Sequence, residues 1–312
     1  MDGVGGGAGT AGGRRLDTTM VAAAARLCQT ADVEYVEFEG QPRLHQPLMV
    51  AAFRGWNDAG GAASLAAGFL RSVTDADRCA VIDSDPFVDY QQSRPIVSLV
   101  DGGVRSLEWP VTEIWASSQH DLLVLVGAEP NMRWRAYSRT VVAIAEKFGA
   151  RMLVTLGALL ADTPHTRPVP VSATASDSRL IDRHGLTPSS YEGPTGIVGV
   201  LHDACGQAGV ASASLWAATP HYVSATPNPQ AAVALLERLG DLLGTPRPTR
   251  DLEMAASEYA LRVASAIADD PDMTGYIEQL EQQVDADEAP TGYQLAADFE
   301  RYLREQGEVD EG

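Results

Sequence analysis

Six polar side chains with acid–base or hydrogen-bonding capacity lie in turns that follow apolar segments of this sequence. They are Asn57, Asp58, Glu129, Asp162, His165 and His221. Carboxylates and imidazoles are the side chains that most often transfer protons in enzymes. If the apolar segments are parallel strands, the turns that follow them lie at one edge of a sheet. The six residues would then converge on one cleft, suited in principle to general acid–base hydrolysis.

The same residues can also be explained by purely structural roles. Asn57 or Asp58, followed by Ala59-Gly60-Gly61, makes a good helix N-cap whose oxygen accepts an otherwise unpaired amide hydrogen bond. A carboxylate there also argues against a phosphate site, because it would repel an anion at the positive end of the helix dipole. His165 lies in a proline-containing loop and can serve to order that loop. Both interpretations stay open, and no catalytic residue is assigned.

Motifs of the common catalytic and metal sites are absent from the sequence. It contains no GxSxG elbow, no GxxxxGK[ST] loop, no HExxH pair and no EF-hand loop. The histidines form no i,i+4 pair, and the cysteines Cys28, Cys79 and Cys205 show no CxxC spacing. Gly7, Gly9 and Gly12 match GxGxxG, but no strand pattern precedes them. We therefore predict no cofactor and no metal site.

The elements that would position the six residues follow the pattern of an α/β fold. Four short apolar runs are expected to be strands, at Leu48–Phe53, Leu122–Gly127, Met152–Gly157 and Ala213–Ala218. Helical patterns follow three of them, at Gly60–Val73, Met132–Phe148 and Pro229–Leu243. Strand, polar turn and amphipathic helix in alternation are typical of βαβ units on a parallel sheet that is buried on both faces.

Other segments indicate antiparallel additions to this sheet. Val33–Phe38 alternates apolar and charged residues like an edge strand. Three closely spaced strands are expected at Ile96–Val100, Val104–Trp109 and Val111–Trp115, with a hairpin turn at Asp101–Gly103. A further helix is expected at Gly196–Gln207. The sequence thus predicts a mostly parallel, mixed central sheet flanked by helices.

The composition divides the chain into four regions. Residues 1–32 are glycine-rich and expected to be disordered, with room for one short helix. Residues 33–243 form the α/β domain, 244–249 a proline-containing linker, and 250–312 a helical region with three apolar stripes. The stripes are Leu252, Ala256, Tyr259, Val263 and Ala266; Ile277, Leu280 and Val284; and Leu295, Phe299 and Tyr302.

The last of these regions carries much of the negative charge. Residues 250–312 hold 4 basic and 17 acidic residues, a net charge of −13, against −19 for the whole chain. Such a region could be a solvated lid packed on its own domain or a docking surface for a basic partner. The overall charge disfavours nucleic-acid binding, because DNA and RNA would be repelled.

The sequence also bears on localisation. Apolar runs stay well below the roughly 20 residues needed to cross a bilayer. The apolar stretch Val21–Ala25 is interrupted at once by Arg26, which makes it a poor secretory signal. We expect a cytoplasmic protein that does not bind membranes.

Several sequence blocks, in a specific order, resemble the PAC2 family, whose members are related to eukaryotic proteasome assembly chaperone 2. The blocks are Leu48–Ala63, Tyr90, Ser93–Pro95, Gly127–Pro130, Trp134, Thr155–Pro168, Gly193–Ile197 and Ala218–Tyr222. The resemblance spans roughly Val33 to Leu243 and points to the actinobacterial branch. It implies a fold similar to that of nucleoside phosphorylases and a homo-oligomer, with a trimer as the expected size.

For function, the resemblance implies a non-enzymatic assembly chaperone or interaction factor, linked to subunits of the 20S proteasome. Such chaperones often dock through a C-terminal hydrophobic–Tyr–any-residue tail. This chain ends Glu308-Val309-Asp310-Glu311-Gly312, so that mode of docking is not expected. The alternative is a small-molecule hydrolase, phosphorylase or ligand-binding protein that uses the cleft at the strand ends, since a fold does not fix a function.

Overall fold

The computed structural model describes residues 33–100, 104–175, 177–188, 192–223, 227–244 and 249–286. The expectations for residues 1–32, the turn at 101–103, positions 245–248 of the linker, the third apolar stripe and the chain end fall outside these ranges. The chain divides into two units, Met1–Val33 and Glu34–Gly312, and the description below concerns the second.

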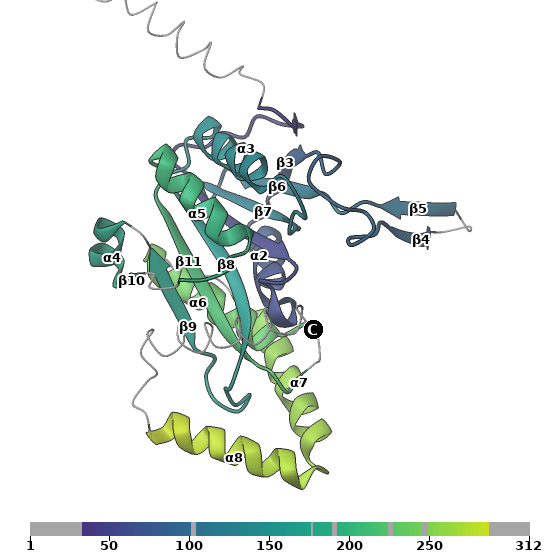
Figure 1. Ribbon diagram of the computed structural model, residues 1–312, viewed down its shortest axis with the longest axis vertical. Coiled ribbons are helices and arrows are strands. Elements are labelled where there is room, and N and C mark those ends of the chain that lie inside the picture. Colours follow the sequence, from purple (N-terminus) through teal and green to yellow (C-terminus); the bar gives the residue numbers. More distant parts are fainter. Residues whose placement is uncertain are drawn as a thin grey trace, which may run out of the picture. The chain divides into compact units, whose positions relative to one another are not determined.

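Within the described ranges, a nine-stranded sheet forms the centre of the fold (Figure 1). Its order is β1 (Val36–Phe38), β3 (Asp77–Ile82), β6 (Thr112–Ser117), β7 (Leu122–Ala128), β2 (Leu48–Arg54), β8 (Met152–Ala161), β11 (Ser212–Pro220), β9 (Val171–Ala175) and β10 (Thr187–Pro188). The neighbours β7, β2, β8 and β11 run parallel. These are the four apolar runs, so the predicted parallel arrangement is confirmed. Antiparallel pairs at both sides make the sheet mixed.

Helices cover both faces of the central strands. Helix α2 (Ala62–Val73) packs against α6 (Pro229–Leu243), and α3 (Trp134–Lys147) packs against α5 (Ile197–Ala208). Val50 and Ala52 of β2 belong to the core cluster that contains α2 and α6. Phe53, on the other face of β2, meets Tyr137 of α3 edge to face. This alternation explains why all of Leu48–Phe53 is buried and apolar.

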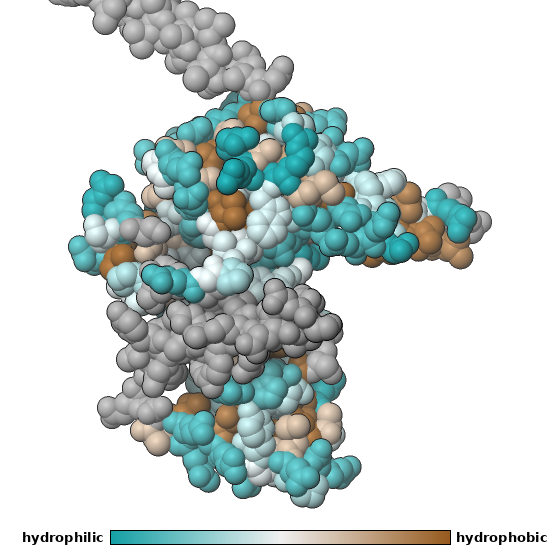
Figure 2. All heavy atoms as spheres, in the orientation of Figure 1, coloured by the Kyte–Doolittle hydropathy of each residue, from teal (hydrophilic) through white to brown (hydrophobic). Residues whose placement is uncertain are grey.

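The three strands expected between residues 96 and 115 belong to two different sheets. Strand β6 joins the large sheet, whereas β4 (Ile96–Val100) and β5 (Val104–Glu108), as far as the chain is described, pair only with each other. The hairpin runs away from the sheet as an arm, and apolar atoms lie along it (Figures 1 and 2). The expected excursion exists, but it is a separate ribbon and not part of the mixed sheet.

The acidic region contains two described helices, α7 (Arg250–Ile267) and α8 (Pro271–Ala286). Leu252, Tyr259 and Val263 are buried along α7, and Ile277 and Leu280 along α8, which confirms these members of two predicted stripes. Ala266, predicted in the first stripe, is exposed, and Ala256 and Val284 are half-buried. Short elements were not predicted: β3, β9, β10 and helix α4 (Ser178–His184). The helix expected from Gly60 begins at Ala62, because Gly60 and Gly61 have positive φ and form a 3-10 turn with Ala59. No helix among the described residues is long and apolar enough to cross a bilayer.

A buried polar network links α5 to β8 and β11. His202 Nε2 lies 2.6 Å from Ser214 Oγ, and His202 Nδ1 lies 2.8 Å from Ser212 Oγ. Thr155 Oγ1 lies 2.8 Å from Ser214 Oγ and 3.0 Å from His202 Nε2. Because hydroxyls can both donate and accept, they satisfy both nitrogens of a neutral imidazole. Burial lowers the pKa of His202 from 6.5 to about 4.

This network predicts an acid-sensitive contribution to stability. The unfolded chain takes up a proton at His202 near pH 6.5 and the folded chain near pH 4, so the contribution is present above pH 6.5 and lost as the pH falls between these values. At about 1.4 kcal/mol per pKa unit, the loss is on the order of 3 kcal/mol. Urea unfolding at several pH values should show this slope in the native chain and a flatter one in His202→Asn. Equal slopes would contradict the assignment.

Candidate functional site

The six predicted site residues all lie where the parallel strands end, but their hydrogen bonds form two sets. Asp58 and Glu129 accept backbone N–H groups at the starts of α2 and α5, and Asn57 bonds to Phe53 of β2 and to Ala158 of β8. Asp162, His165 and His221 bond to groups around the ends of β8 and β11 and to helix α8. The strand topology therefore places the residues at one edge, as expected, and the two sets have different partners.

Asp58 is a helix-capping residue. Its Oδ1 accepts hydrogen bonds from the backbone N–H of Ala63 at 2.7 Å and of Ser64 at 3.2 Å, and its Oδ2 accepts the Ser64 hydroxyl at 2.6 Å. These amides belong to the first turn of α2, whose N–H groups have no partner within the helix. Burial raises the pKa of Asp58, while the bonds from Ser64 and Ala63 oppose the shift. Asp58 therefore accepts first-turn amides as the structural interpretation expected, although Gly61 occupies the N-cap position of α2.

Asn57 fixes the turn between β2 and α2. Its Nδ2 donates to the carbonyl of Phe53 at 3.1 Å, and its backbone carbonyl accepts the N–H of Ala158 in β8 at 3.0 Å. The side chain is 1% exposed, and its Oδ1 finds no hydrogen-bond partner among the described residues. Asn57 thus ties the end of β2 to β8.

Glu129 performs the corresponding task at α5. Its Oε1 accepts the backbone N–H of Ile197, the first residue of that helix, at 3.0 Å. Burial raises the pKa of Glu129, and hydrogen bonds from the amides of Ile197 and Trp56 oppose that shift. A Cβ on Gly196 would lie 2.9 Å from Glu129 Oε1, so a larger residue there would displace the carboxylate from its present position. The block Gly193–Ile197 therefore leads into a helix start that receives a carboxylate.

The second set centres on Tyr222, just after β11. Its hydroxyl accepts the backbone N–H of His165 and forms a hydrogen bond with His165 Nδ1 in which either atom can be the donor, both at 2.9 Å. The Nε2 of His165 is buried and has no partner in the described part of the chain. Burial lowers the pKa of His165, so its ring is neutral at neutral pH. His165 orders its loop, as the structural interpretation proposed.

Asp162 and His221 form the most exposed pair of the six. His221 Nδ1 lies 3.1 Å from Asp162 Oδ1, and the Tyr276 hydroxyl of α8 donates to the same oxygen at 3.1 Å. The rings of His221 and Tyr276 have centroids 5.7 Å apart. This pair is the arrangement that comes nearest to an acid–base couple. Among the described residues no group of three or more His, Cys, Asp or Glu side chains could hold a metal ion.

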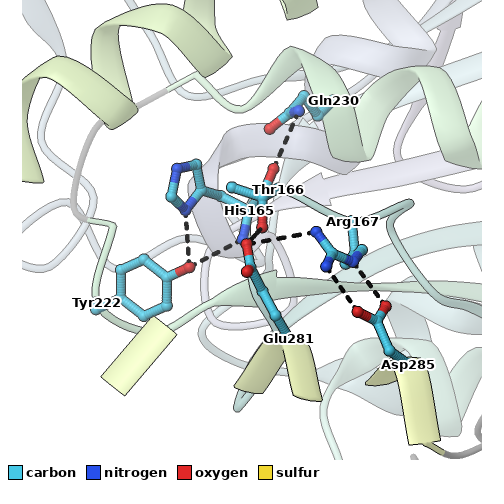
Figure 3. Close-up of polar contacts among 7 residues, drawn as sticks. All are labelled: His165, Thr166, Arg167, Tyr222, Gln230, Glu281 and Asp285. Carbon is cyan, nitrogen blue, oxygen red and sulfur yellow. Dashed lines mark hydrogen bonds and ion pairs between the residues drawn. The ribbon is translucent and has the colours of Figure 1, made fainter. Parts of the chain in front are cut away.

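Helix α8 supplies site residues that sequence reasoning did not single out. Arg167 donates two hydrogen bonds of 2.8 Å to the two carboxylate oxygens of Asp285 and lies 3.4 Å from Glu281 (Figure 3). The hydroxyl of Thr166 donates to the same Glu281. We call these four residues the α8 clasp. The clasp and Tyr276 hold the acidic helix on its own domain, as the lid interpretation proposed.

The capping role of Asp58 can be tested by mutation. Asp58→Ala would leave buried amides of α2 without acceptors, so the free energy of unfolding should fall by about 1–3 kcal/mol. Asp241→Ala, which removes an exposed carboxylate of α6, should change it by less than about 0.5 kcal/mol. Urea denaturation measures both changes. Equal effects of the two substitutions would show that Asp58 does not cap α2.

Comparisons with known proteins agree with this architecture. The model of the PAC2 family matches residues 52–267. A PAC2 family protein from Streptomyces avermitilis is 45% identical, with 74% of this chain and 99% of that chain covered and a TM-score of 0.68. A Mycobacterium tuberculosis protein described as a proteasome-assembly chaperone homologue, Rv2125, is 43% identical, with 74% and 99% covered and a TM-score of 0.67.

A more distant structure covers more of the chain. The Mycobacterium tuberculosis protein Rv2714, of unknown function, is 28% identical, with 88% of this chain and 97% of that chain covered and a TM-score of 0.76. No curated protein matches the sequence. The family match extends over more than half of the chain and includes Asn57, Asp58, Glu129 and the loop of His165. The chain belongs to the PAC2 family.

Proposed function

We propose that this chain is a non-enzymatic assembly chaperone that acts on proteasome subunits. The observation that carries the proposal is its likeness, over nearly the whole length of that relative, to the mycobacterial proteasome-assembly chaperone homologue. The hydrogen bonds at the candidate site also support a non-enzymatic role. The carboxylates of Asp58 and Glu129 accept backbone N–H groups at helix starts, which is a structural use of side chains that could otherwise act as bases.

A small-molecule reaction at the strand ends is the less favoured alternative. It would depend on Asp162 and His221, because the other carboxylates of the set serve as caps. That pair lies beside Tyr276 of α8 and is about half exposed. An exposed pair in water has little of the desolvation that makes catalytic groups effective.

The chaperone proposal is tested with the full chain and the 20S proteasome subunits of its native bacterium. Mixed with separately purified α and β subunits, the chain should co-elute with them in gel filtration and increase the yield of assembled particles at least several-fold. Native gels and peptidase activity measure assembly. Bovine serum albumin at the same concentration controls for crowding. Unchanged yield together with separate elution would contradict the proposal.

We also propose that the chain forms a homo-oligomer, with a trimer as the expected size, through the β4–β5 hairpin. Val97, Leu99 and Leu107 are 52%, 73% and 51% exposed. Val97 is opposite Leu107 in the register, and Leu99 follows two residues after Val97, so the three share one face of the ribbon. An isolated two-stranded ribbon is marginally stable in water, and exposed apolar patches usually mark an interface.

The oligomer proposal predicts a mass difference between two matched variants. Leu99→Asp with Leu107→Asp places charges on the apolar face, whereas Ser98→Asp with Ser106→Asp places the same charges on the opposite face. Light scattering should give a multiple of 33.1 kDa for the native chain and the serine variant, and 33.1 kDa for the leucine variant. A monomeric native chain at micromolar concentration would refute the proposal.

A further inference from the structure

Helix α8 presents a defined set of side chains to the domain beneath it. Ile277 and Leu280 are buried, and Tyr276, Glu281 and Asp285 bond to residues that follow β8. Their spacing puts them along one side of the helix. Other acidic side chains of α8, such as Asp272 and Glu278, are exposed. The helix is therefore amphipathic, with two carboxylates four residues apart at the edge of its apolar stripe.

The surface under α8 is complementary to that set. Arg167 offers a planar pair of donors that matches a carboxylate, and it engages Asp285 in this way while Thr166 donates to Glu281 (Figure 3). On the other side, Tyr276 packs against Tyr222, with ring centroids 6.1 Å apart. Its hydroxyl reaches Asp162. Arg167, Thr166, Tyr222, Asp162 and His221 together form what we call the helix-docking surface.

The contacts that hold α8 on the domain are few and partly exposed, so another helix can replace them. In α8, whose residues are all described, Ile277 and Leu280 are the buried side chains, and neither belongs to the main core cluster. Helix α6, by contrast, buries eight residues, most of them within that cluster. The ion pairs of the clasp are partly exposed, with Arg167 at 30% and Asp285 at 57%, so water and salt weaken them.

We propose that the helix-docking surface is a binding site for an acidic amphipathic helix of a partner protein, and that α8 is its internal occupant. The partner helix would carry an aromatic residue and two carboxylates at the spacing of Tyr276, Glu281 and Asp285. It would bind by displacing α8 and would use Arg167 as its anchor. The inference rests on the proposed chaperone function, which requires a protein partner, and it names the chemistry of the segment that is bound.

The test uses the full chain and a fluorescent peptide with the sequence of residues Asp270–Ala286. Glu281→Lys with Asp285→Lys in the chain should repel its own α8 from Arg167 and free the surface. By anisotropy, this variant should bind the native peptide at least tenfold more tightly than the native chain does. Asp272→Lys with Glu278→Lys makes the same change in charge on the exposed side of α8, and it should bind like the native chain.

A charge exchange makes the assignment specific. A peptide with lysines at the positions of Glu281 and Asp285 should fail to bind the first variant, and Arg167→Glu in the chain should restore its binding. Hydrogen exchange should show faster exchange in α8 of the first variant, while circular dichroism shows the same cooperative melting of the domain. Unchanged exchange in α8, or equal peptide affinity of the variant and the native chain, would overturn the proposal.

The assay contains no proteasome subunit, so its outcome is independent of the assembly experiment. If the variant with Glu281→Lys and Asp285→Lys binds the peptide no more tightly than the native chain does, the helix-docking proposal is wrong. This holds even if proteasome subunits bind elsewhere on the chain. Tight peptide binding without effect on assembly contradicts the chaperone function alone. If cross-links join α8 of one copy to Arg167 of another in the native chain, the occupant is a second copy, and the assignment to a partner protein is wrong.

Discussion

Parallel hydrogen bonding between β7, β2, β8 and β11 is the constraint from which the rest of the structure follows. Parallel strands need crossover connections, and here the connecting helices cover both faces of the sheet. All four strands therefore end at one edge, where helices begin and expose unpaired N–H groups. The chain meets this demand with Asp58 at α2, Asn228 at α6 and Glu129 at α5.

The need to pair these N–H groups explains why the residues at the strand ends look like a catalytic site in the sequence. A carboxylate after a strand can serve as a base or as a cap, and its residue type does not distinguish the two roles. Asp58 and Glu129 each accept backbone N–H groups here, so much of the polar chemistry at the edge goes into holding helices in place. Two surface features do not serve to cap these helices, namely the apolar hairpin and the surface under α8. The oligomer proposal rests on the first of these features and the helix-docking proposal on the second.

Long buried elements could be predicted from the sequence, and short or half-buried ones could not. Helix α6 begins and ends where its pattern predicted, because Asn228 and Pro229 mark its start and Gly244 its end. Strand β3 was missed, since Asp77 and Arg78 at its start are exposed and break the apolar run. Strand β9 was missed as well, because Val171–Ala175 is short, polar at every second residue and follows a proline-rich loop.

The sequence by itself determined which long, buried segments are strands or helices and which turns carry the polar residues, because burial imposes periods of two and 3.6 residues on local sequence. Only the tertiary structure decided what those polar residues bind. Glu129 meets the start of α5 across 68 positions, and Arg167 meets Asp285 across 118. Such long-range pairs produce no periodic pattern in the sequence. From the sequence alone, the carboxylates of Glu129 and Asp285 cannot be distinguished from solvent-exposed ones, because only packing brings their donors within hydrogen-bond distance.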